Sequence, residues 1–237
     1  MVEGLLLAWF EEHRRDLPWR RRRDPYAVLV SEVMLQQTQV ARVVPRFEQW
    51  MQRWPTVEAL AAAGRDEVIV AWQGLGYNRR AVNLHQAARI VASGGWPADL
   101  TDLPGVGRYT ADAVRRFALG ESVLPRDTNV VRVIERTGVE FGPKAAEALM
   151  DLGREVCLAR VPRCDVCPLA IRCPSRGRRY EPQRKQSRFE GSFRQRRAET
   201  LRLVASGQTE QLDRAAVDSL ARDGLVDVEG DLVALPK

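Results

Sequence analysis

Apolar residues follow helical spacing along most of the first 175 residues, and strand-like alternation is scarce. Several segments place apolar positions three or four residues apart and end on glycine or on a short polar connection. They cover residues 25–37, 38–54, 56–76, 78–95, 109–120 and 129–138. No internal repeat and no alternation of strands with helices is evident. The pattern therefore predicts an all-α fold for this part of the chain.

Local signals predict where several of these helices begin and end. Thr38 and Thr56 stand where N-cap residues are expected, because a threonine hydroxyl accepts a hydrogen bond from a backbone N–H of the first turn. Pro45 predicts a kink or a restart of the helix around it. Gly94 and Gly95 end the segment 78–95, as glycine commonly does at a helix C-terminus.

The composition changes after Cys173. From Arg176 to Arg197 nine residues are basic and two are acidic, which predicts an extended basic linker over 176–198. Residues 199–237 offer two helical segments and then two short apolar runs around Glu229 and Gly230, which is a hairpin signal. Helix, helix and hairpin predict a small winged-helix-like segment, which either binds DNA or packs on the body of the protein.

The charge balance favours a polyanionic partner. The formal net charge is +6, and arginine supplies nearly all of the positive charge, with a planar fork of donors that suits phosphate. Ordinary surface charge explains the balance equally well. No segment approaches the roughly 20 apolar residues of a membrane span, and the N-terminus lacks the basic start of a signal peptide. We therefore expect a cytoplasmic protein with no membrane partner.

All four cysteines lie within one short segment, with the spacing C-x6-C-x2-C-x5-C: Cys157, Cys164, Cys167 and Cys173. In a cytoplasmic protein such clustering favours a metal site over disulfides. Four thiolates suit a 4Fe–4S cluster or tetrahedral zinc, and unligated thiols remain a third possibility. Zinc sites usually use two C-x2-C pairs, whereas this segment has one, so the spacing favours iron and sulfur. Arginines flank the cysteines and would present positive charge to DNA.

The segment LPGVGRYTADAV, residues 103–114, places two glycines in a tight turn before a helix. Such a turn lets backbone N–H groups approach a phosphate, and the helix dipole favours the anion. The pattern is typical of a helix–hairpin–helix DNA-binding motif.

Two carboxylates are candidates for chemistry. Glu32 lies within an apolar helix, where burial raises the pKa of a carboxyl group as a general acid requires; a salt-bridged or exposed glutamate is the alternative. Asp127 lies at a helix start, where N-capping is the simpler interpretation. N-glycosidic cleavage needs such a pair, because one group protonates the leaving base and the other stabilises the cationic sugar.

Several motifs together resemble the helix–hairpin–helix glycosylase superfamily, and most closely its adenine DNA glycosylase (MutY) family. The resemblance covers residues 4 to 175, and the motifs are LVSEVMLQQTQV, GLGYNRRAVNLH, LPGVGRYTADAV, RDTNVVRV and MDLGREVC with the three cysteines that follow. The cysteine spacing is similar to that family's 4Fe–4S signature, so the resemblance implies this cluster, bound by Cys157, Cys164, Cys167 and Cys173.

The resemblance also implies roles for individual residues. Glu32 matches the acid that protonates adenine N7, and Asp127, with Asn129 beside it, matches the carboxylate that stabilises the C1′ cation. Tyr109 matches a tyrosine near these carboxylates. Gln37 and Tyr77 match residues that insert into the duplex. Arg15, Arg20 and Leu35 match residues that line the base pocket. The hairpin turn that binds phosphate is matched by Gly105, Val106 and Gly107.

The residue at position 109 bears on the reaction type. Bifunctional relatives have a lysine there that forms a Schiff base and cleaves the strand. This chain has Tyr109, and its first lysine is Lys144, so the resemblance implies a monofunctional enzyme. Two departures from the family are evident. The span from Arg136 to Met150 is short, as if a helical segment were missing behind Asp127, and we expect a short form without the Nudix-like C-terminal domain.

We expect a helix–hairpin–helix DNA glycosylase fold of two helical lobes. Residues 24–126 form a six-helix domain, residues 1–23 and 127–175 form an iron–sulfur domain, and DNA lies between them. The linker 176–198 and the winged-helix-like tail 199–237 follow. The expected function is the removal of adenine mispaired with 8-oxoguanine or guanine in double-stranded DNA by a monomer in the cytoplasm, at the nucleoid. The alternatives are a thymine or uracil glycosylase at G mismatches and a non-catalytic DNA-binding iron–sulfur protein.

Overall fold

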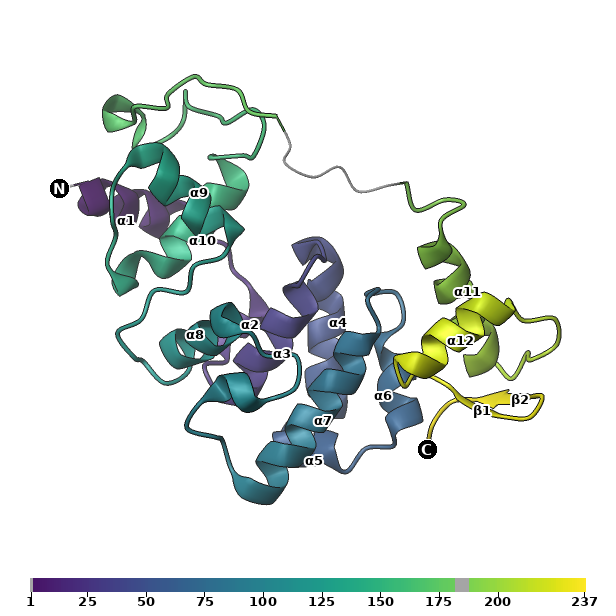
Figure 1. The fold of residues 1–237 in the computed structure, drawn as a ribbon. Coiled ribbons are helices and arrows are strands. Elements are labelled where there is room, and N and C mark those ends of the chain that lie inside the picture. Colours follow the sequence, from purple (N-terminus) through teal and green to yellow (C-terminus); the bar gives the residue numbers. More distant parts are fainter. Residues whose placement is uncertain (1, 182–187) are drawn as a thin grey trace. The chain divides into compact units, whose positions relative to one another are not determined.

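Helices dominate the fold, which we describe from a computed structural model for residues 2–181 and 188–237 (Figure 1). The α-helices are α1 Val2–His13, α2 Pro18–Arg21, α3 Pro25–Leu35, α4 Val40–Arg53, α5 Val57–Ala61, α6 Arg65–Trp72, α7 Arg79–Gly94, α8 Arg108–Phe117, α9 Thr128–Thr137, α10 Ala146–Glu155, α11 Phe193–Ala205 and α12 Arg214–Arg222. Short 3-10 turns are η1 Leu100–Asp102, η2 Pro143–Ala145 and η3 Ala170–Arg172, and the strands are β1 Asp227–Glu229 and β2 Leu232–Ala234. The all-α prediction is confirmed for residues 1–175 as far as they are described.

Most of the predicted helix ends are observed. Thr56 caps α5 by accepting from the N–H of Ala59, and Gly95 ends α7 with φ of 78°. Thr38 is a correction, because α4 begins after Gln39 with no side-chain cap. The Thr38 hydroxyl is buried and donates to carbonyl oxygens instead. Segment 56–76 also forms two helices, α5 and α6, rather than one.

By internal contacts the chain divides into two compact units. The first unit consists of the described residues of Met1–Val28 and Arg108–Lys185, and the second of those of Leu29–Gly107 and Gln186–Lys237. Helix α8 thereby groups with the N-terminal helices, whereas the predicted lobes place it within 24–126. The predicted boundaries stay a prediction.

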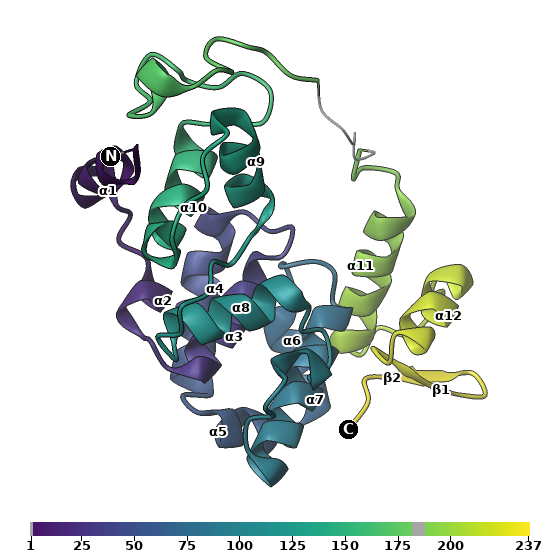
Figure 2. The same ribbon diagram turned by 60° about the vertical axis from the view of Figure 1, so that its left-hand side comes forward.

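The first unit has a core built mainly from α9 and α10, which lie side by side (Figures 1 and 2). Val130, Val133, Leu149 and Leu152 are almost completely buried in it, together with Leu6 of α1. Helix α9 ends at Gly138 with φ of 67°, and Phe141 and Ala145 of the connection to α10 enter the same core. The short connection that follows Arg136 in the sequence therefore contributes apolar side chains to this core.

The second unit is built around α4 to α7 and includes the C-terminal segment. Trp50 packs edge-on against both Trp54 and Trp72, with ring centroids 4.7 and 5.5 Å apart. A further core joins Ile69 of α6 and Val82 of α7 to the tail, whose contributing residues are Leu201, Val204, Val217, Leu220, Leu225, Val226 and Val233.

The tail has two helices followed by the hairpin β1–β2, paired antiparallel with Glu229 opposite Leu232. Of the two roles considered for it, packing on the body is observed. Helix α11 begins at Phe193, within the predicted linker 176–198, and residues 182–187 of that linker lie outside the described residues. None of the described helices is both long and apolar enough to cross a membrane.

Candidate functional site: two carboxylates, a glycine hairpin and a cysteine pocket

Glu32 lies in α3, a helix whose other side chains are mostly apolar. Every residue from Tyr26 to Met34 is buried, and Glu32 itself is 7% exposed. Because the helix is apolar on all sides, it has no solvent-facing stripe on which a carboxylate could remain hydrated. The burial that the sequence predicts for Glu32 is observed.

Asp127 is the N-cap of α9, as the simpler interpretation of the sequence has it. Its Oδ1 accepts from the backbone N–H groups of Asn129 and Val130, at 2.9 and 2.7 Å. Its Oδ2 accepts from the Asn129 side-chain amide at 2.7 Å. These three donors and the positive end of the α9 dipole hold the half-buried carboxylate in one orientation. Capping and electrostatic chemistry are compatible, since a fixed negative charge is what a cationic intermediate requires.

A chain of hydrogen bonds runs from Asp127 toward the cysteines. The Asn129 side-chain oxygen accepts from Arg132 at 2.7 Å, and Arg132 Nε donates to the carbonyl oxygen of Cys157 at 2.8 Å. Burial lowers the pKa of Arg132. Gly153 on α10 lets the two helices approach here, because a Cβ at that position would lie 2.7 Å from Asn129 Cβ. Arg132 and Gly153 lie within the motifs RDTNVVRV and MDLGREVC, but neither was predicted as a site residue.

The four cysteines line one pocket together with mainly apolar side chains. Their sulfurs are not gathered closely, since no three His, Cys, Asp or Glu side chains of residues 2–181 and 188–237 are placed to hold a metal ion. The surroundings nevertheless suit a soft anionic cluster. Gly177 N–H points at Cys164 Sγ, at 3.3 Å, and the Arg136 guanidinium lies 3.5 Å from Cys157 Sγ. Burial raises the pKa of the Cys167 thiol to about 11, so binding a cation there releases a proton.

Arg136 is a buried arginine that sequence reasoning missed. It is 7% exposed and donates to the carbonyl oxygens of Leu158 and Ala159, each at 2.7 Å. Its guanidinium also lies 3.7 Å from the ring centroid of Tyr180. Arg136 therefore attaches the cysteine-containing loop to α9.

The glycine hairpin has the geometry that the sequence predicts. Gly105 has φ of 76°, and a Cβ there would lie 2.9 Å from the Asn83 side chain, so only glycine fits without displacement. Val106 is buried and donates its N–H to the Leu103 carbonyl oxygen, whereas Gly105 and Gly107 are exposed. Helix α8 starts directly afterwards, with Tyr109 half-buried in its first turn.

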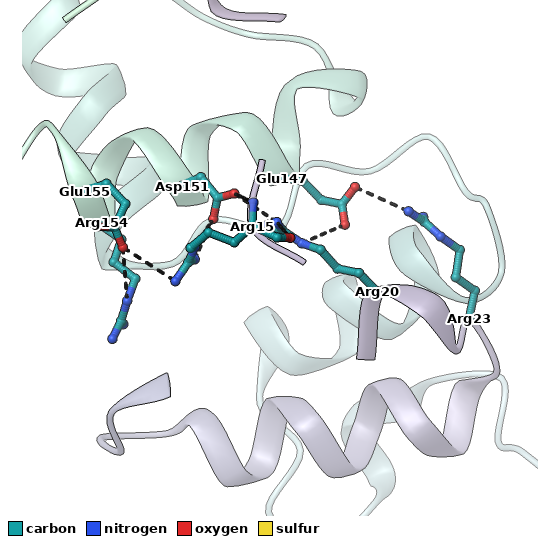
Figure 3. Close-up of polar contacts among 7 residues, drawn as sticks. All are labelled: Arg15, Arg20, Arg23, Glu147, Asp151, Arg154 and Glu155. Atoms are coloured by element: carbon teal, nitrogen blue, oxygen red, sulfur yellow. Dashed lines mark hydrogen bonds and ion pairs between the residues drawn. The ribbon is translucent and has the colours of Figure 1, made fainter. Parts of the chain in front are cut away.

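Arg15 and Arg20, assigned to the base pocket by resemblance, converge on Asp151 of α10 (Figure 3). Arg15 Nε and Arg20 NH1 each donate to the Asp151 carboxylate at 2.9 Å, and the Asp151 side chain is 1% exposed. The network continues through Glu147, which pairs with Arg20 at 3.2 Å and with Arg23 at 3.4 Å. Asp151 was not predicted as a site residue. The sequence signal that could have identified it is an aspartate placed between apolar residues of a helix.

Gln37, Tyr77 and Leu35 belong to the second unit. Gln37 and Tyr77 are exposed and have left-handed backbone angles, with φ of 55° and 46°. Leu35 is half-buried at the end of α3. The structure thus brings Asp127 and Asn129 together, whereas the pairing of Glu32 with Asp127 stays a prediction.

Comparisons with known proteins address the family of the chain. The family model described as HhH-GPD superfamily base excision DNA repair protein matches residues 30–157. A protein of Mycolicibacterium smegmatis named adenine DNA glycosylase is 41% identical, over 95% of this chain and 92% of its own length. The human adenine DNA glycosylase is 39% identical, over 74% of this chain and 39% of its own length.

Solved structures agree as well. A thermostable thymine-DNA glycosylase superposes with a TM-score of 0.64 at 29% identity, covering 73% of this chain and 93% of that one. A trapped covalent complex of endonuclease III with DNA gives a TM-score of 0.62 at 24% identity, over 73% of this chain and 92% of its own, which supports the fold. The chain belongs to the HhH-GPD superfamily of base excision DNA repair proteins, in the group formed by the adenine DNA glycosylases.

Proposed function

We propose that the protein is a monofunctional DNA glycosylase that hydrolyses the N-glycosidic bond of adenine mispaired with 8-oxoguanine or guanine in double-stranded DNA. The observation that carries the proposal is the contrast between two carboxyl groups. Glu32 is buried in an apolar helix, whereas Asp127 accepts from three N–H donors at a helix N-terminus. A buried position in an apolar helix suits a proton donor, and a carboxylate held by three N–H donors suits the stabilisation of positive charge.

In this mechanism Glu32 delivers a proton to adenine N7 and so makes the base a better leaving group. The Asp127 carboxylate stabilises the positive charge that develops at C1′, and Asn129 holds that carboxylate in orientation. The C1′–N9 bond breaks, water adds at C1′, and the proton that this water loses returns to the Glu32 carboxylate, which completes hydrolysis. Tyr109, in place of the lysine of bifunctional relatives, orients the site and forms no covalent bond to the sugar. Gly105 and Gly107 present backbone N–H groups to a phosphate.

The four cysteines, in this proposal, hold a 4Fe–4S cluster that fixes the fold of residues 157–173. What supports it is one pocket lined by all four cysteines, with Arg136 beside Cys157 and the Gly177 N–H beside Cys164 to offset thiolate charge. A protein purified without oxygen should contain iron and sulfide rather than zinc. Replacing Cys164 by serine should lower the iron content and destabilise this segment, because ligand loss removes folding free energy.

The test of the catalytic proposal is Glu32→Gln. Glutamine keeps the size of the side chain but cannot donate the proton, so single-turnover release of adenine from an adenine:8-oxoguanine duplex should fall by about 10²–10⁴-fold or more. Binding to the same duplex should change little. Glu48→Gln, a matched change at an exposed position of α4, should release adenine at the wild-type rate. Wild-type release by Glu32→Gln would reject the assignment.

Thymine or uracil removal at G mismatches is a second candidate, because a solved relative is a thymine-DNA glycosylase. The same assay with thymine or uracil opposite guanine separates the two functions. A protein that binds mismatched duplexes but releases no base would favour the non-catalytic alternative. We further propose that it acts as a monomer in the cytoplasm, at the nucleoid.

A further inference from the structure

One buried guanidinium joins two surface turns of the second unit. Arg80, in the first turn of α7, is 9% exposed, and all three of its guanidinium nitrogens donate hydrogen bonds. Nη1 donates to the carbonyl oxygens of Val33, Met34 and Gln36, at 2.6, 3.1 and 2.7 Å. Nη2 donates to Thr38 Oγ1 at 3.1 Å and to the carbonyl oxygens of Leu75 and Gly76 at 3.1 and 2.8 Å. Nε donates to the carbonyl oxygen of Tyr77 at 3.3 Å.

Val33 and Met34 lie in the last turn of α3, and the other acceptors lie on two turns that are far apart in the sequence. The first turn, residues 36–38, follows α3, and the second turn, residues 75–77, precedes α7. Thr38 joins the same two turns, because its hydroxyl lies 3.2 Å from the Gln36 carbonyl oxygen and 3.3 Å from that of Leu75. Arg80 and Thr38 therefore connect the two turns by hydrogen bonds.

Each turn carries an exposed residue in a strained conformation. Gln37 and Tyr77 are two of the three non-glycine residues with positive φ in the described part of the chain. The left-handed region is uncommon for residue types other than glycine, asparagine and aspartate. Such strain persists only where the surroundings impose it. Here Arg80 holds the carbonyl group that precedes each strained residue, those of Gln36 and Gly76.

The choice of arginine follows from this geometry. A planar fork with five N–H groups can serve acceptors on both turns at once, whereas a lysine ammonium offers three. The guanidinium also meets the carbonyl end of α3, where a positive charge is favourable. Burial lowers the pKa of Arg80 to about 10, so the group remains protonated at neutral pH. Burying a charge among neutral oxygens is costly, so its role is better explained by position than by stability.

We propose that Arg80 is a positioning residue that locks Gln37 and Tyr77 into one preorganised pair for insertion into a mismatched duplex. The inference rests on the proposed function, in which these two side chains enter the duplex. Because hydrogen bonds hold both turns before DNA binds, the backbone of the turns does not have to be ordered in the complex, and the saved ordering cost increases mismatch affinity.

Two variants and one control test the proposal. Arg80→Lys keeps the charge and loses the fork, and Thr38→Val removes one hydroxyl at nearly constant volume. Arg79→Lys is the control, because Arg79 is exposed and pairs with Asp223 at 3.4 Å. Arg80→Lys should reduce the preference for an adenine:8-oxoguanine duplex over the matched duplex about 10- to 100-fold. Thr38→Val should act in the same direction more weakly, and the control should match the wild type.

A readout without DNA separates the proposal from the proposed function. Amide hydrogen exchange at residues 36–38 and at 75–77 should accelerate together in Arg80→Lys, with the helices unaffected. In a background lacking both side chains, Gln37→Ala with Tyr77→Ala, Arg80→Lys should cause no further loss of mismatch preference. Faster exchange in one turn alone, or an equal loss in that background, would overturn the proposal.

Two further outcomes are distinguishable. If the wild type itself lacks mismatch preference, the proposed function fails, whereas the exchange experiment still tests whether Arg80 couples the turns. If Arg80→Lys does not fold, Thr38→Val carries the same two tests, and unchanged exchange in both turns of that variant would overturn the proposal.

Discussion

Asp151→Asn should destabilise the protein strongly although the substitution is nearly isosteric. The Asp151 carboxylate accepts from Arg15 through one oxygen and from Arg20 through the other, and its side chain is 1% exposed (Figure 3). An asparagine there retains one acceptor. Its NH₂ group would face a guanidinium that also donates, so one arginine loses its buried acceptor and gains a donor at close range.

The magnitude follows from the burial of the three groups. Removing one partner of a buried pair costs about 3–5 kcal/mol, because a charge remains without compensation. The side chains of Arg15 and Arg20 are 25% and 16% exposed, and Arg20 keeps Glu147 at 3.2 Å. We therefore expect the lower end, about 3 kcal/mol, which corresponds to a fall in Tm of roughly 6–12 °C for a chain of this size.

Urea unfolding followed by circular dichroism measures this loss, and an unchanged m-value would confirm that stability alone has changed. Asp16→Asn is the matched control. Asp16 also pairs with an arginine, Arg21, but these side chains are 71% and 67% exposed, so the substitution should change stability little. A loss below 1 kcal/mol for Asp151→Asn, or equal losses for both variants, would refute the reasoning.

The remaining predictions concern a histidine and a glycine. Burial and two nearby arginines hold the pKa of His85 below its usual 6.5, so the unfolded state takes up a proton first and stability falls as the pH drops below about 6.5. His85→Gln should flatten Tm against pH between 7.5 and 5.5, and His13→Gln, at an exposed position, should not. Gly153→Ala should lower both stability, by about 1–3 kcal/mol, and base release, because the new Cβ displaces Asn129. Gly4→Ala, with open space around it, should stabilise α1 by about 0.5–1 kcal/mol; a destabilised Gly4→Ala would count against the glycine argument.

Sequence patterns predicted what short-range physics determines. The apolar helix around Glu32, the glycine turn at 105–107 and the capping position of Asp127 each depend on residues within one or two turns of the chain. Thr38 shows the limit of such signals. Its position before a helix favoured N-capping, but its hydroxyl bonds to Leu75, 37 residues away, which no local pattern reveals.

Buried charges were the main class of residue that the sequence could not predict. Arginine in a chain of net charge +6 favours a surface role toward phosphate. Arg80 and Arg136 are instead buried and bind backbone carbonyl oxygens, and Asp151 meets Arg15 across 136 residues. Backbone acceptors have no residue type, so the partner of a buried arginine leaves no trace in the sequence.

The core that the tail shares with α6 and α7 has an evolutionary consequence. Ile69 and Val82 are covered by apolar side chains of α11, α12 and the hairpin. A gene rearrangement that cut the chain in the linker and attached a different C-terminal domain would uncover both residues at once. Domain exchange at this junction would therefore require compensating substitutions at positions 69 and 82, so we expect the tail to be inherited together with the helices on which it packs.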